Sequence, residues 1–173
     1  SRGGMNRYRQ LDHLLLQPTV SIKRVARLLA CTPPTAAKLV TALESRGWLR
    51  ELTGCVRTYG VDHGLDALPA IARTLGMRVV LGAWIDGDAV RNTAQLERAL
   101  ALGRDYADVI DLLVIGNEVL LRGEQTPAAL AALLARAKRD SAVPIAYADV
   151  WAFWLRHADV LREHVDVVAA HVL

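Results

Sequence analysis

The residues best suited to chemistry are an adjacent amide and carboxylate, Asn117 and Glu118, which follow an apolar run over 109–115. A run of this length predicts a buried strand, so both side chains are expected at the strand's carboxyl end. A carboxyl group held there can give a proton to a leaving oxygen, and the amide beside it can bind a hydroxyl group. The alternative is that Glu118 is a solvated loop carboxylate, since short motifs alone are weak signals.

Polar and aromatic residues also follow the other predicted strands, which alternate with predicted helices. The predicted strands are 56–59, 78–85, 109–115, 143–148 and 167–170, and the predicted helices are 65–75, 93–106, 127–138 and 150–165. Continuous apolar strands between helices predict an α/β fold with a parallel sheet covered on both faces. Sites in such folds form at the carboxyl ends of the strands, where this sequence has Tyr59, Trp84, Asp86, Asp149 and His171.

Five segments within residues 55–173 resemble the bacterial β-1,3-glucanases of glycoside hydrolase family 17. They are VRTYG (56–60), LGAWI (81–85), VIGNEVLLRGE (114–124), YADVWAFWL (147–155) and DVVAAHVL (166–173). The resemblance implies a TIM-type (β/α) barrel, of which residues 55–173 would supply strands two to six. It also implies β-1,3-glucan as the ligand and no cofactor.

The resemblance assigns roles to six residues at the strand ends. Glu118 would be the general acid/base and Asn117 would bind a sugar hydroxyl group. The other residues expected to contact glucan are Arg57, Tyr59, Trp84 and His171. Tryptophans are more often core residues than sugar contacts, and of Trp151 and Trp154, three apart on a helix, one is expected to pack inward.

The expected catalytic machinery is incomplete in these residues. A retaining glycosidase needs a second carboxylate about 5 Å from the acid, to act as nucleophile. The family carries it on its seventh strand, beyond strands two to six, which the resemblance covers. Glu124 lies in the loop after Glu118, whereas Asp86 and Asp149 follow other strands. The chain alone is therefore expected to be an inactive glucanase-like fragment.

Charge divides the chain into two parts. Residues 1–54 carry nine Lys and Arg against three Asp and Glu, whereas residues 55–173 carry 12 against 15. This change of sign suggests two units with different partners, at 1–54 and 55–173, of which the basic one could face nucleic acid.

The sequence of the basic unit predicts a winged helix-turn-helix. Helices are expected over 6–16 and 22–29, the second capped by Ser21, and from Pro33 to Gly47. The segments VSIKRVA (20–26), TPPTAAKL (32–39), LESRGWL (43–49) and RELTG (50–54) resemble the C-terminal winged-helix module of Fic-type proteins, without the Fic catalytic motif. The expected DNA contacts are Thr35, Lys38, Thr41 and Arg46. The alternative, which the sequence favours equally, is that these side chains lie on a solvated face of the third helix in a module that binds other proteins.

Residues 55–60 can complete the wing, antiparallel to 48–52, or form a barrel strand parallel to 78–85, but not both. We therefore expect two unrelated segments joined near 53–55, by natural fusion, by truncation of a reading frame or artificially. An open barrel would also leave sheet edges at 56–59 and 167–170, which favours self-association. The side chains expected to face inward would lose the layers of side chains that the absent strands normally provide. They are Val79, Val80, Leu113 and Val114.

The remaining composition excludes several classes of protein. No apolar run approaches the roughly 18 residues that a membrane span needs, and the first residues lack a signal-peptide core, so a cytoplasmic location is expected. The two cysteines are expected to be reduced thiols. No phosphate-binding loop is present, and His157, Glu163 and His164 lack zinc-site spacing, so no metal is expected.

Overall fold

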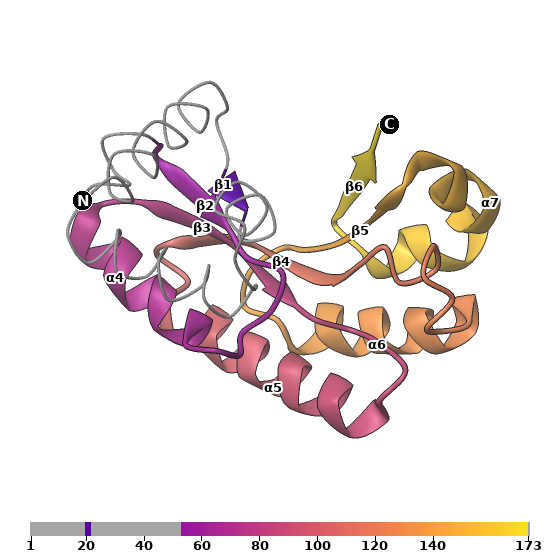
Figure 1. The fold of residues 1–173 in the computed structure, drawn as a ribbon, viewed down its shortest axis with the longest axis horizontal. Helices are drawn as coiled ribbons and strands as arrows, with labels where there is room; N and C mark the ends of the chain where they lie inside the picture. The colour runs from indigo at the N-terminus through magenta and orange to yellow at the C-terminus, as the bar shows by residue number, and fades with distance from the viewer. Residues whose placement is uncertain (1–19, 22–52, 173) are drawn as a thin grey trace, which may run out of the picture.

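The computed structural model describes residues 20–21 and 53–172, and within them the fold is a curled, all-parallel sheet flanked by helices (Figure 1). The six strands lie side by side in chain order. They are β1 (Val20–Ser21), β2 (Cys55–Arg57), β3 (Arg78–Ala83), β4 (Ile110–Asn117), β5 (Ile145–Val150) and β6 (Val167–His171). The predicted α/β architecture with a partial TIM-type barrel is confirmed for β2–β6.

Helices connect successive strands from β2 to β6, as parallel pairing requires. They are α4 (Leu68–Leu75), preceded by the 3-10 turn η2 (Leu65–Ala67), α5 (Ala89–Asp105), α6 (Pro127–Asp140), and α7 (Trp151–Leu161), which continues into η3 (Arg162–His164). Figure 1 shows α4, α5 and α6 along one side of the sheet. None of the helices in the described part of the chain is long and apolar enough to cross a membrane.

Helix α5 begins four residues before the predicted position because of its cap. The Asp88 carboxylate accepts hydrogen bonds from the backbone N–H groups of Val90 and Arg91, which lack partners inside the helix. Asp86 in turn accepts a hydrogen bond from the Asp88 N–H, at 2.8 Å. The acidic loop after β3 is therefore a capping structure, a role that hydrophobic periodicity does not reveal.

The pairing of β2 decides between the two interpretations of residues 55–60. β2 pairs parallel with β3, as predicted for a barrel strand, and its other neighbour is β1, also parallel. Ser21, expected to cap a helix, instead lies in β1 opposite Arg57. The wing interpretation of β2 is therefore wrong, and β1 occupies the edge expected at 56–59. The other elements of the predicted winged helix lie outside the described residues, and the division at 54 and 55 stays a prediction.

The two faces of the sheet are filled differently. Val79 and Leu113 are fully buried in the main core between the sheet and the helices, so the expectation that they lose cover is wrong. Side chains alternate along a strand, so Val80 and Val114 point to the opposite face. There they belong to a smaller cluster with Leu112, Ala146, Ala148 and Ala169. Val114 is also buried, which contradicts its expected exposure.

Strand β6 is the last strand of the described sheet, at the edge predicted from sequence. Val167 is 42% exposed and Val168 52%. Self-association through this strand stays a prediction.

Gly82 allows β2 and β3 to approach each other. A Cβ atom at Gly82 would lie 2.5 Å from the carbonyl oxygen of Thr58 and 2.7 Å from the Cα atom of Tyr59. The Gly82 N–H donates a hydrogen bond to the Thr58 hydroxyl group at 2.9 Å. The backbone that carries Tyr59 is thus set directly against β3.

We predict that Gly82→Ala lowers the free energy of unfolding by about 1–3 kcal/mol or more, because a backbone oxygen cannot move aside as a flexible side chain can. Urea denaturation measures the loss. Gly87→Ala is the control, since a methyl group added at Gly87 would meet nothing within 4 Å. Equal stability of the two variants would contradict the prediction.

Asp166 connects the start of β5 to the segment that leads into β6. Its carboxylate accepts a hydrogen bond from the Ile145 N–H at 2.9 Å, and its own N–H donates to the Ile145 carbonyl oxygen, also at 2.9 Å. Lys138 of α6 lies 3.2 Å away. The hydrogen bond from Ile145, assisted by Lys138, lowers the pKa of Asp166 below its usual value.

A lowered folded-state pKa makes the Asp166 contribution to stability complete above the unfolded-state pKa of about 4, and the contribution is lost as the pH falls through the lower folded-state value. We predict that Asp166→Asn reduces stability near neutral pH and weakens the acid dependence of unfolding below pH of about 4. Denaturation at a series of pH values tests this, with the exposed Asp159→Asn as control. An unchanged acid slope in Asp166→Asn would be the contrary result.

Candidate active site

The turn at the end of β4 places Asn117 and Glu118. β4 advances three residues, from Val114 to Asn117, while β5 advances two, from Ala146 to Ala148. This extra residue is a bulge, a feature that redirects side chains at strand ends. Gly116 has φ +83° and Glu118 has φ +55°, so two residues of the turn are left-handed. The left-handed backbone is unusual for glutamate and is typical of functional sites.

Glu118 is held from two neighbouring strands. Its N–H donates a hydrogen bond to the carbonyl oxygen of Ala148 in β5, at 2.7 Å. Its Oε1 atom lies 2.9 Å from Nδ1 of His171 in β6. Both side chains are partly buried. The carboxyl group therefore has a defined partner and remains partly open to solvent.

Asn117 faces the opposite direction along the sheet. Its side-chain oxygen accepts a hydrogen bond from Nη2 of Arg57 in β2, at 3.1 Å. The Arg57 guanidinium lies 5.0 Å from the centre of the Tyr59 ring. Within the described residues, Nε of Arg57 is buried without a hydrogen-bond partner. An unmet buried donor is costly and marks a position where a ligand oxygen could bind.

A buried layer lies beneath Glu118. Asp149, at the end of β5, is fully buried, and its carboxylate accepts hydrogen bonds from the Tyr147 hydroxyl group and from the N–H groups of Leu120 and Val150. The Tyr147 hydroxyl group also accepts from the Leu120 N–H, at 3.1 Å. Burial, reinforced by the hydrogen bond to Asp149, raises the pKa of Tyr147. This layer anchors the chain two residues after Glu118.

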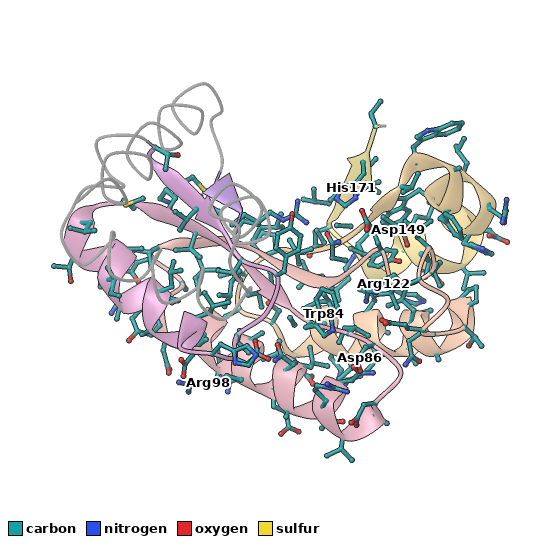
Figure 2. All side chains as sticks on the ribbon, viewed as in Figure 1. Trp84, Asp86, Arg98, Arg122, Asp149 and His171 are labelled. Carbon is teal, nitrogen blue, oxygen red and sulfur yellow. The ribbon has the colours of Figure 1, made fainter. Side chains whose placement is uncertain are left out.

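The tryptophans divide between surface and core. Trp84 is half-buried at the end of β3, with the Arg122 guanidinium 4.3 Å from the centre of its ring. Trp154 is 5% exposed and donates a hydrogen bond to the Ala169 carbonyl oxygen, whereas Trp151 is 50% exposed. The prediction that one of this pair packs inward is therefore confirmed. Figure 2 shows Trp84, Arg122, Asp149 and His171 in the same part of the molecule.

The predicted site residues thus come from the ends of four strands, β2, β3, β4 and β6. Hydrogen bonds or ring contacts join Arg57 to Tyr59 and Asn117, and Glu118 to His171; Trp84 is joined to this group through Arg122, which also donates to the Asn117 carbonyl oxygen. The predicted DNA contacts Thr35, Lys38, Thr41 and Arg46 lie outside the described residues, so DNA binding stays a prediction.

Sequence reasoning gave no supporting role to Arg122, Tyr147, Asp149 or Gln95. Gln95 accepts hydrogen bonds from the N–H groups of Val61 and Trp84, both at 3.1 Å. Two of the four could have been found, because a carboxylate directly after an apolar strand and an arginine within the VIGNEVLLRGE segment are visible in the sequence.

Comparison with known proteins gives a consistent family. The family model of the BtgE/BtgC glycoside hydrolase domain matches residues 33–173. The chain is 25% identical over 139 residues to a probable beta-glucosidase btgE of Aspergillus fumigatus, covering 77% of this chain and 24% of that protein. It is 28% identical over 140 residues to a probable glucan endo-1,3-beta-glucosidase btgC of Aspergillus clavatus, covering 68% and 20%.

A solved structure shares the fold. The glycoside hydrolase family 17 beta-1,3-glucanosyltransferase of Rhizomucor miehei superposes with a TM-score of 0.65 at 24% identity, over 82% of this chain and 52% of that one. An active-site mutant of the Rhizomucor miehei beta-1,3-glucanosyltransferase, in complex with laminaritriose, has the same TM-score and covers 51% of its chain. The present chain thus spans about a quarter of the curated relatives and half of the solved ones.

We predict that Tyr147→Phe lowers the free energy of unfolding by about 1–3 kcal/mol, because the buried Asp149 carboxylate loses a donor. Chemical denaturation measures the loss. Tyr106→Phe is the control, since the ring of Tyr106 stacks on Arg73 at 4.4 Å and this contact survives removal of the hydroxyl group. A Tyr147→Phe protein as stable as the wild type would show that the hydroxyl group contributes nothing to this layer.

Proposed function

This chain belongs to the BtgE/BtgC glycoside hydrolase domain family, and on that premise we propose that Glu118 is the general acid/base of a domain that acts on β-1,3-glucan. The observation that carries the proposal is the pairing of Glu118 with His171 at the carboxyl ends of parallel strands. In such folds the reacting groups lie at these ends. The names of the btgC relative and of the laminaritriose complex support a β-1,3-linked glucan as substrate.

Glu118 would protonate the oxygen of the departing sugar. His171, in contact with Oε1, would orient the carboxyl group and exchange a proton with it between the two halves of the reaction. Asn117 would bind a hydroxyl group of the sugar, with its amide orientation set by Arg57. The Nε–H of Arg57, which has no hydrogen-bond partner among the described residues, would donate to a sugar oxygen if the guanidinium moved slightly. Tyr59 and Trp84 would contact sugar rings.

The second carboxylate of a retaining mechanism would have to come from outside the described residues. Asp149 is fully buried and already accepts three hydrogen bonds. Asp86 accepts a hydrogen bond from the Asp88 N–H and pairs with Arg91 at 3.2 Å. Glu124 is paired with Arg122 at 2.6 Å. Because each is engaged elsewhere, we propose that the isolated chain binds glucan without hydrolysing it.

The acid/base role can be tested by binding. A laminari-oligosaccharide whose scissile oxygen is replaced by an amine presents a cation to the Glu118 carboxylate at neutral pH. We predict that the chain binds this analogue about tenfold more tightly than the parent sugar, and that Glu118→Gln abolishes the preference because it removes a charge-assisted hydrogen bond. Isothermal titration calorimetry measures both affinities.

Glu97→Gln, on α5 and paired with Arg136, is the matched control and should keep the preference. A preference for the amine that survives Glu118→Gln would refute the assignment of Glu118. No binding of either sugar by the folded wild-type chain would refute the proposed glucan site as a whole.

A further inference from the structure

Arg122 joins the loops that follow β3 and β4. Its guanidinium donates hydrogen bonds to the carbonyl oxygen of Asn117 and, at 2.7 Å, to that of Ile85. The same group lies 4.3 Å from the centre of the Trp84 ring. One planar cation therefore contacts the residue before Glu118, the residue after Trp84 and the indole itself.

The charge of Arg122 is already balanced. Glu124 accepts hydrogen bonds from Nε at 3.0 Å and from Nη2 at 2.6 Å, and both side chains are partly buried. A cation with its own carboxylate has little attraction for an anionic ligand. Its remaining role is geometric, because the guanidinium plane holds a fixed orientation relative to the ring and the two carbonyl groups.

The orientation of Trp84 is set from two directions. Its backbone N–H donates to the buried side chain of Gln95 at 3.1 Å, which fixes the main chain. Arg122 lies against the indole, which restricts the side chain. Aromatic platforms that are held in place before binding lose less entropy when a ligand stacks on them.

We propose that Arg122 is a positioning residue that holds Trp84 ready to stack on a neutral pyranose ring of the glucan. The proposal rests on the proposed function, since it names the feature of that site that recognises the sugar ring. The guanidinium lies over one face of the indole, and the sugar ring would stack on the other. The hydrogen bond to the Asn117 carbonyl oxygen ties this platform to the turn that carries Glu118.

The first test is a double-mutant cycle on laminaritriose affinity. Arg122→Met keeps the apolar stem and removes the guanidinium, and we expect it to weaken binding about threefold to tenfold, the range of a partly buried cation–aromatic contact. In a Trp84→Leu background the same change should have no further effect. A residue with a merely structural role would give the same loss with or without Trp84, so additive losses would overturn the proposal.

The second test needs no glucan. Acrylamide quenching of Trp84, obtained as the difference between each protein and its Trp84→Phe counterpart, should rise in Arg122→Met. Arg73→Met is the matched control, because Arg73 also stacks on an aromatic ring, that of Tyr106, and pairs with Asp108. It should change neither quenching of Trp84 nor glucan affinity.

Unchanged quenching in Arg122→Met overturns the positioning role whether or not glucan binds. Raised quenching in a chain whose wild type binds no glucan overturns the proposed function and supports the hold on Trp84. If Arg122→Met does not fold, Arg122→Lys replaces it in both tests. Lysine keeps the charge beside Glu124 but lacks the planar fork, so raised quenching is again expected and unchanged quenching again overturns the role.

Discussion

The turn at the end of β4 is the constraint on which the candidate site depends. Neighbouring residues of a regular strand point to opposite faces, so a regular continuation of β4 would direct Asn117 and Glu118 to opposite faces of the sheet. The bulge and the left-handed backbone at Gly116 and Glu118 remove this restriction. Asn117 then reaches Arg57 in β2, while Glu118 reaches His171 in β6.

A left-handed glutamate costs about 1–3 kcal/mol, which the surroundings must offset. The hydrogen bond from Glu118 to Ala148 and the bonds of Leu120 to Tyr147 and Asp149 do so, and all of them reach β5. β5 thus stabilises the turn that β4 presents. The buried carboxylate of Asp149 is understandable in these terms, because its oxygen atoms satisfy backbone donors that the irregular turn leaves without partners.

The site has a rigid lower layer and a partly exposed upper layer. Below, Tyr147 and Asp149 are buried and fully hydrogen-bonded. Above, Glu118, His171 and Trp84 keep part of their surface in solvent. Since Tyr147 and Asp149 anchor the turn that carries Glu118, this arrangement favours a site that is organised before a ligand arrives.

The sequence predicted the strands β3 to β6, their parallel order, and the position of Asn117 and Glu118 at a strand end. Each of these depends on a local apolar run and on the residues that directly follow it. The pairing of β2 with β1 was not predicted, since it joins residues far apart in the chain and leaves no local pattern. The direction in which Asn117 and Glu118 point, the burial of Asp149 and the stacking of Arg122 on Trp84 were decided only by tertiary structure. Side-chain direction at a strand end depends on a bulge, whose register is set by the neighbouring strand and not by the residues within it.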